Sequence, residues 1–174
     1  SMCVVFTLSE RGFPRTLEGR KVEGYAIIKY QNTWFDGVPY SLPFMKPAVN
    51  ISHDEAIRLC ESKGEGWHLI TNDEWVALGF WSWDNDTMPT GNTASGKSHS
   101  HPEQTGITDE GGCGKTLTGS GPVQWNHDGT AYGVADMCGN IWEHVGGVRF
   151  MGGMPQVIPN NGAAYGADQS KDSP

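Results

Sequence analysis

The stretch DMCGNIWEHVGG, residues 136–147, combines polar side chains with one tryptophan and three glycines. Its polar members with metal-ligating atoms are Asp136, Asn140, Glu143 and His144. Oxygen ligands and an imidazole suit a divalent cation, so a metal site is one interpretation. A structural role is favoured instead: Asn140 follows a glycine in a tight turn, and Trp142 is expected to anchor the core. Glu143 would then bond to backbone groups or to a basic residue such as Arg149.

Two helices are predicted upstream of this stretch. SHDEAIRLCES begins with Ser52 and has Glu55 three residues later, which is a capping box. Apolar residues at positions 56, 57, 59 and 60 form one face, which predicts a helix over about 53–63. In TNDEWVALGFWS, Thr71 and Glu74 form a second box, and Trp75 shares a face with positions 78 and 79. This pattern predicts a helix over about 72–82.

The other segments give weaker signals. Residues 4–6 and 25–30 are rich in β-formers and predict short strands. Residues 36–49 contain three prolines and predict an irregular connector. Residues 83–122 contain almost no aliphatic side chains, so we expect a long loop without a core of its own. Residues 123–137 resemble a hairpin with HDG as its turn, and residues 148–159 predict two short strands around a glycine pair.

Composition limits the classes of protein that fit. With 174 residues, 24 glycines and 10 prolines, the chain predicts one loop-rich α+β domain over residues 1–174. The net charge of −8 argues against nucleic acid and anionic membranes as partners. No run is long and apolar enough for a membrane span, and no signal peptide is visible.

Motifs for catalysis or metal binding are incomplete. His99 and His101 form an HxH pair that could chelate a metal with His127 or Cys113, although no further acid or histidine completes the pattern. The chain has no GxSxG motif and no complete phosphate-binding loop. Its four cysteines form no CxxC pair, and we expect them to be reduced.

Two motifs resemble those of a known family. GVADMCGNIWEHVGG (133–147) resembles the GNxWE signature of the formylglycine-generating-enzyme/sulfatase-modifying family, a branch of the C-type lectin fold. HLITNDEWVALGF (68–80) is similar to another family segment and comes in the expected order. GGVRFMGGMPQVIPNN (146–161) looks closest to phage and prophage members, including receptor-binding domains and retroelement-diversified variable proteins.

The resemblance implies a C-type-lectin-like α+β fold: two helices on a small, mostly antiparallel sheet with long irregular loops. It also implies that Trp75, Asn140, Trp142 and Glu143 are structural residues of the family's motifs. His144 stands where the family has a tryptophan, which places a titratable group there. The family's closing strand is missing, so the domain may be incomplete at its C-terminus.

The catalytic residues of the family do not carry over. Its copper-holding cysteine pair lies near the C-terminus, whereas this chain has no cysteine after Cys138. We therefore expect a protein without enzymatic activity and without a required cofactor. Calcium is a minor possibility, through Asn140 and backbone carbonyls.

The expected function is recognition of a cell-surface protein or glycan, as in a phage or prophage receptor-binding domain. We expect the contact surface on residues 83–121 and after residue 152, although the tryptophans of this set could equally be buried. Its members are Trp81, Trp83, Asn160, Asn161 and Tyr165. One alternative is a sulfatase-modifying type metal or thiol oxidase or oxygenase, with Cys113, Cys138, His99 and His101 as candidates. Another is a structural subunit of a tail or surface appendage. A homo-oligomer is possible, and a virion or cell-surface location is favoured.

Overall fold

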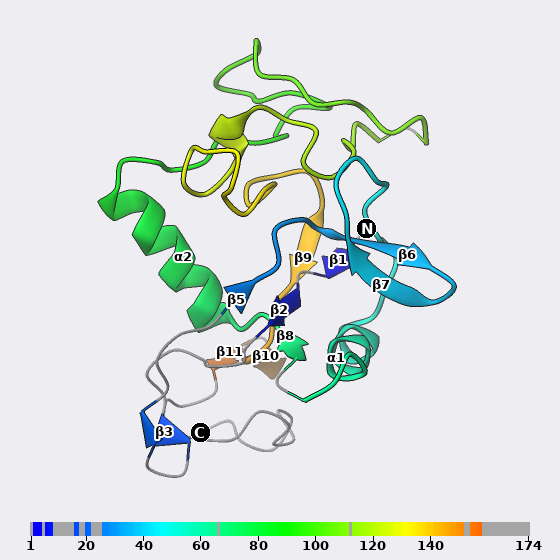
Figure 1. Cartoon of the computed structure of the whole chain (residues 1–174), viewed down its shortest axis with the longest axis vertical. Helices are drawn as coiled ribbons and strands as arrows, with labels where there is room; N and C mark the ends of the chain where they lie inside the picture. Colours follow the sequence, from blue (N-terminus) through cyan, green and yellow to red (C-terminus); the bar gives the residue numbers. More distant parts are fainter. Residues whose placement is uncertain are drawn as a thin grey trace.

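The computed structural model describes residues 2–4, 6–8, 16–17, 20–21, 26–65, 67–111, 113–151 and 154–157. Two α-helices lie in this part of the chain, α1 (His53–Glu61) and α2 (Asn72–Asp84). They flank short central strands, while residues after α2 form a large irregular region at the top of Figure 1. The architecture is α+β. No helix in the described part of the chain has the length and hydrophobicity needed to cross a membrane.

The strands form small, separate sheets. The three-stranded sheet has the order β5 (Ala26–Ile27), β2 (Phe6–Leu8), β8 (Trp67–Leu69), with both pairs antiparallel. Two hairpins are β3–β4 (Thr16–Leu17, Arg20–Lys21) and β10–β11 (Val148–Met151, Met154–Val157). The pair of strands predicted around Gly152 and Gly153 is therefore confirmed. β9 (Trp142–His144) runs parallel to β1 (Met2–Val4).

Both predicted helices are confirmed, with small differences in their ends. At α1, the Ser52 hydroxyl accepts the Glu55 amide, but Glu55 turns to Arg58 and leaves the box half formed. At α2, Thr71 and Glu74 cap each other in both directions. α1 ends two residues earlier than predicted, and α2 continues to Asp84 because no helix breaker precedes the turn there.

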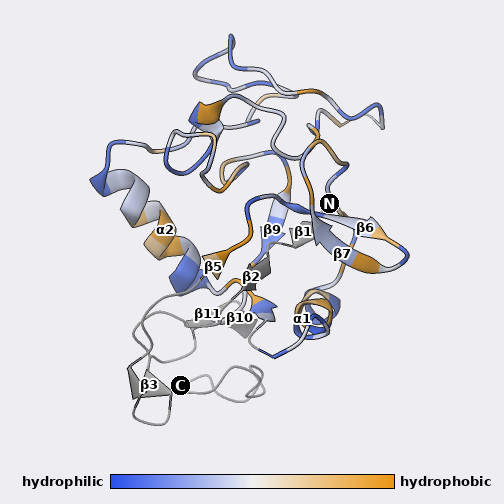
Figure 2. Ribbon diagram, viewed as in Figure 1, coloured by the Kyte–Doolittle hydropathy of each residue, from blue (hydrophilic) through white to orange (hydrophobic). Residues whose placement is uncertain are grey.

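The apolar core is small and lies between α1 and β8. Its buried members are Ile51, Ala56, Leu59, Cys60 and Leu69. Half-buried side chains from neighbouring segments pack against them, including Trp34 and Trp67. Figure 2 shows how little apolar sequence the irregular upper region contributes.

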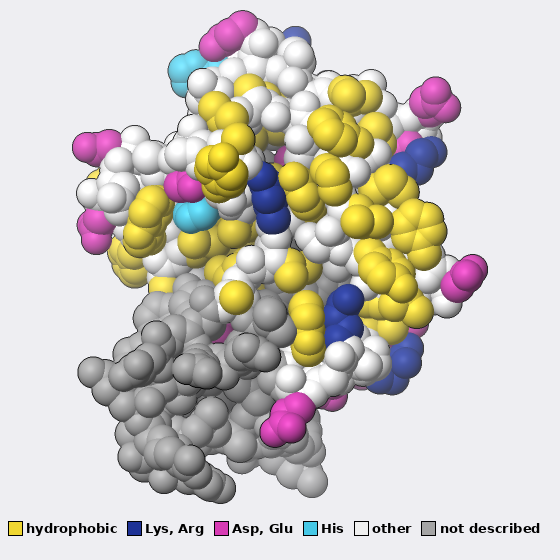
Figure 3. All heavy atoms as spheres, viewed as in Figure 1, with side chains coloured by type: hydrophobic (Ala, Val, Ile, Leu, Met, Phe, Trp, Pro, Cys, Tyr) yellow, Lys and Arg dark blue, Asp and Glu magenta, His cyan; other side chains and the backbone are white. Residues whose placement is uncertain are grey.

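The prediction of an irregular connector over residues 36–49 was wrong for its first part. β6 (Asn32–Phe35) and β7 (Val38–Ser41) form an antiparallel hairpin. Asp36 and Gly37 both have positive φ, which is the geometry of a two-residue hairpin turn. Pro39 is tolerated because this sheet has only two strands, so each strand is an edge. Exposed apolar side chains gather over this hairpin at the right of Figure 3.

The hairpin predicted for residues 123–137 is replaced by a closed loop. A short 3₁₀ helix covers Val123–Trp125, and a turn follows at Asp128. Val134 and His127 then exchange two hydrogen bonds, including one from the Val134 amide to His127 Nδ1. His127 Nδ1 and the Asp128 carboxylate thus accept hydrogen bonds from backbone amides that would have paired with a neighbouring strand in a hairpin.

The irregular region after α2 is folded around buried polar groups. Thr116, Thr118, Ser98 and Asn92 are buried there although the segment lacks aliphatic residues. Thr116 and Thr118 are fully enclosed, and Thr118 bonds to Leu42 across the chain. We expected this segment to lack a core of its own because it has few aliphatic residues. It instead packs around buried polar side chains, whose hydrogen bonds replace apolar contacts.

Candidate functional site

The motif at residues 136–147 borders a groove of about 520 Å³. One wall comes from α2 and another from the loop at residues 92–93, and the motif supplies the rest. The lining is mixed in character. Its aromatic members are Trp75 and Trp142, its apolar members are Met137, Ile141 and Val145, and its polar members are Asn92, Thr93, Asn140 and Glu143, together with Gly139. A groove of this volume and mixed lining is suited to a small ligand or a part of a larger one.

The turn that shapes the groove depends on unusual backbone angles. Asp136, Gly139 and Asn140 all have positive φ, at 59°, 76° and 62°. A Cβ on Gly139 would lie 2.3 Å from the carbonyl oxygen of Asn92. The two segments can therefore cross at this distance only with glycine there, and the crossing brings Asn92 beside Asn140.

Asn140 is the centre of a hydrogen-bond network. Its Nδ2 donates to Gln31 Oε1 at 2.9 Å and to the Thr116 carbonyl at 3.2 Å. Its Oδ1 accepts from the Thr116 amide at 2.8 Å, the Thr116 hydroxyl at 3.2 Å and Asn92 Nδ2 at 3.1 Å. The side chain thus joins three segments that are far apart in the sequence.

Gln31 connects this network to two carboxyl groups. Its Nε2 donates to Glu143 Oε1 at 2.7 Å and to the Asp136 carbonyl at 3.3 Å. The Asp136 carboxyl, which is 1% exposed, accepts the Gly119 amide at 2.6 Å. Gln31 is therefore a side-chain partner of Glu143, and the side chain of Arg149, which the sequence suggested as a partner, lies outside what the structure describes.

Both carboxyl groups have raised pKa values. Burial raises the pKa of Asp136 to about 6, although the Gly119 amide opposes the shift. Burial raises the pKa of Glu143 to about 8; the Gln31 hydrogen bond lowers it and the nearby Asp136 raises it further. Glu143 thus lines the groove as a buried acid, and Asp136 acts on it electrostatically from outside the lining.

These shifts predict the effect of Glu143→Gln on stability. A raised folded-state pKa means that stability is fully present below the ordinary pKa and is lost as pH rises through about 8. We expect the variant to be more stable than the parent by several kcal/mol at pH 8.5, at about 1.4 kcal/mol for each unit of the shift, with the difference vanishing near pH 4.5. Urea unfolding of both proteins across this range measures it, and a difference that is constant with pH contradicts the assignment.

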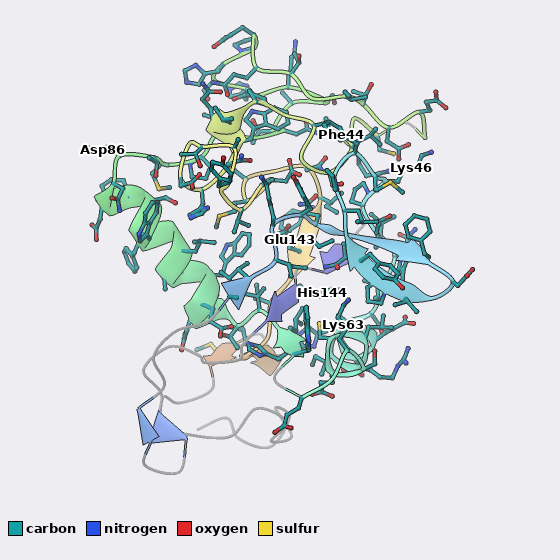
Figure 4. The ribbon with its side chains drawn as sticks, in the orientation of Figure 1. Phe44, Lys46, Lys63, Asp86, Glu143 and His144 are labelled. Atoms are coloured by element: carbon teal, nitrogen blue, oxygen red, sulfur yellow. The ribbon has the colours of Figure 1, made fainter. Side chains whose placement is uncertain are left out.

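Glu143 and His144 are neighbours in β9 (Figure 4), so the alternation of side chains along a strand places them on opposite faces. His144 Nε2 contacts the Ile51 carbonyl at 3.0 Å, and His53 Nε2 contacts the Val145 carbonyl at 3.0 Å. A carbonyl oxygen only accepts, so each Nε2 carries a proton, and the two rings pack edge to face at 5.4 Å. His144 therefore fastens β9 to the start of α1.

The metal interpretation of the four polar residues gains no support from these positions. Alternation along β9 sends Glu143 and His144 to opposite faces, and Asn140 is occupied by its network. His99 and His101 are exposed, and His127 packs on Trp81 at 5.1 Å. No cluster of three His, Cys, Asp or Glu side chains suited to a metal exists in the parts of the chain that the structure describes.

The expectation that Trp142 anchors the core was wrong, because its side chain is 78% exposed. The core position in this strand belongs to His144, which is buried. Trp142 instead borders the groove together with the half-buried Trp75. An exposed tryptophan adds little to core packing, so the Trp142 side chain is available at the edge of the groove.

Of the residues predicted to contact a ligand, Trp81 and Trp83 are 46% and 69% exposed on α2. They do not line the groove. Asn160, Asn161 and Tyr165 lie outside the described residues. Sequence reasoning missed Gln31 and Asn92, since no local pattern singles out either residue and their partners are distant in sequence.

The fold and the site together define a class of protein: an α+β domain with a ligand-sized groove at a GNxWE turn. A model of the sulfatase-modifying factor enzyme 1-like domain matches residues 10–148, and the chain belongs to this family. The observed α+β arrangement is consistent with the C-type-lectin-like fold of that family. A search of curated proteins finds no match.

Proposed function

We propose that the protein is a non-catalytic recognition domain of phage or prophage type, which binds a cell-surface molecule in the Trp142 groove. The observation that carries the proposal is Trp142 itself, a large aromatic side chain that is 78% exposed beside a 520 Å³ groove. Aromatic side chains provide large contact area at low conformational entropy cost, which suits recognition.

The floor of the groove supports this proposal because it is rigid. Both N–H groups of Asn92 are engaged, by Gly114 and Asn140, and its Oδ1 accepts the Gly96 amide. Asn140 donates from Nδ2 to Gln31 and Thr116 and accepts the Thr116 amide at Oδ1. Side chains held in this way need not be ordered when a ligand arrives, so less binding energy is lost.

Trp142→Ala tests the proposed function. We expect the variant to lose at least about tenfold in affinity for the host cell, since central aromatic residues of an interface contribute about 2 kcal/mol or more. Its stability should change by less than about 0.5 kcal/mol because the side chain is exposed. Binding of labelled protein to a panel of host cells measures the loss.

Tyr132→Ala is the matched control, since Tyr132 is 91% exposed and does not line the groove. We expect it to bind cells like the parent. Equal binding by the Trp142 variant and the parent would remove the groove from the recognition surface. In that case the exposed Trp81 and Trp83 are the next residues to substitute.

A sulfatase-modifying type enzyme is the second candidate, and family membership favours it. It would need a thiol or metal site. Burial raises the pKa of Cys138, and also that of Cys60, so both thiols are poor nucleophiles at neutral pH. Cys113 is exposed and is therefore the better thiol candidate of the three cysteines whose side chains are described. Metal analysis of the purified protein discriminates, because stoichiometric copper or iron would favour the enzyme.

A further inference from the structure

The polar chemistry that the groove offers to a ligand is concentrated in Glu143. The side-chain N–H groups of Asn92 and Asn140 are already donated within the protein. Glu143 Oε1 accepts from Gln31, and its other carboxyl oxygen has no hydrogen-bond partner among the described residues. Thr93 adds one hydroxyl, whose oxygen accepts the His99 amide at 2.8 Å. The groove thus presents an acid and a hydroxyl.

The charge around the groove favours a cation. No lysine or arginine is among its described lining residues. The Asp136 carboxyl lies behind Glu143 and acts on it electrostatically, and the chain as a whole carries a net charge of −8. A cation in the groove stabilises the ionised form of Glu143 and so lowers its raised pKa, whereas an anionic ligand would raise that pKa further and meets no positive side chain in the described lining.

The remaining lining indicates which kind of cation fits. Trp142 and Trp75 present indole rings, and tryptophan is the aromatic side chain that attracts cations best. Met137, Ile141 and Val145 are apolar and offer no side-chain oxygen to a metal ion. Indole rings, methyl groups and a single carboxyl group together match an alkylated ammonium group, which is large, weakly hydrated and positively charged.

We propose that the Trp142 groove binds a quaternary ammonium group of the choline type, with Glu143 as its counter-charge. This inference rests on the proposed recognition function and specifies the chemical class of the ligand. Trp142 and Trp75 contact the methyl groups, and Glu143 is the residue that distinguishes a charged group from a neutral group of the same shape.

Isothermal titration with choline and with 3,3-dimethyl-1-butanol tests the proposal. The alcohol is the neutral carbon analogue of choline, so apolar contacts alone would bind both equally. We expect choline to bind at least about tenfold more tightly to the parent protein at pH 9, where Glu143 is ionised, as a cation–π contact and an ion pair together provide. Glu143→Gln keeps the shape of the side chain and should reduce the preference for choline several-fold.

The dependence of choline affinity on pH provides a second readout. A cation binds the ionised form of Glu143 more tightly, and the pKa of this group in the empty site is about 8. Affinity should therefore rise about tenfold from pH 6 to pH 9 and level off above that, while Glu143→Gln keeps only the smaller rise that comes from Asp136. Asp136, with a pKa of about 6, is the other titratable group acting on Glu143, and its ionisation changes affinity in the same direction.

Vesicles of phosphatidylcholine distinguish the sources of this group. Binding to choline and to vesicles assigns it to a lipid, and binding to choline alone assigns it to a non-lipid carrier; either result supports the proposal. Equal affinity for choline and the neutral alcohol, or no binding of either, overturns it. Host-cell binding that still depends on Trp142 would then leave the recognition function standing, with a different ligand.

Discussion

Asn140→Ala should lower the free energy of unfolding by about 4 kcal/mol, because it removes five hydrogen bonds whose partners stay buried. Gln31 and Thr116 are 1% and 0% exposed, so water does not replace the lost partner without opening the structure. Part of the effect comes from the backbone, since alanine must adopt φ near +62°. Urea unfolding monitored by tryptophan fluorescence gives the value.

Asn50→Ala is the matched control for the backbone contribution. Asn50 also has φ of +62°, but its side chain is exposed. This variant should lose only about 1 kcal/mol, the penalty for alanine in the left-handed region. Similar losses in the two variants would mean that the network around Asn140 contributes little beyond its backbone geometry.

Glu74→Ala is expected to lower the free energy of unfolding by about 3–4 kcal/mol, since it breaks a buried hydrogen bond with His68 and a helix cap together. The carboxylate is 3% exposed and accepts from His68 Nε2 at 3.1 Å. It also accepts from the Thr71 amide and hydroxyl, both at 2.9 Å. Truncation leaves these buried donors without this partner. Chemical denaturation at pH 7 measures the loss.

Glu55→Ala provides the comparison at the same position of the other helix. Glu55 is exposed and its carboxylate pairs with Arg58 at 3.5 Å, so its removal should lower stability by about 0.5 kcal/mol. If Glu55→Ala lowers the free energy of unfolding as much as Glu74→Ala does, the burial of Glu74 does not explain the effect of its removal.

The contribution of Glu74 also has a defined pH dependence. Burial alone would raise its pKa, but the bonds from His68 and Thr71 outweigh it, and the pKa lies below the ordinary value. Stability from this group is therefore present above the ordinary pKa and is lost as pH falls through the lower folded-state value. The difference between parent and Glu74→Ala should shrink accordingly in acid.

Both helices could be predicted from the sequence because their signals are local. Ser52 and Thr71 each satisfy an amide three residues later, and this chemistry needs no distant partner. The Asp36–Gly37 turn is equally local, but the three prolines that follow it favoured the prediction of an irregular connector. Trp142 was misjudged because a residue type does not reveal whether its strand face is covered. That depends on how β9 sits against the other elements.

The sequence by itself determined the family, the two capped helices and the turn at Asn140, since each follows from residues close together in the chain. Only the tertiary structure decided the site. Gln31 reaches Asn140 and Glu143 across 109 and 112 positions, and Asn92 reaches Asn140 across 48. Such contacts depend on where the folded chain places each segment, which no local pattern encodes. The exposure of Trp142, the raised pKa of Glu143 and the groove between them are consequences of that placement.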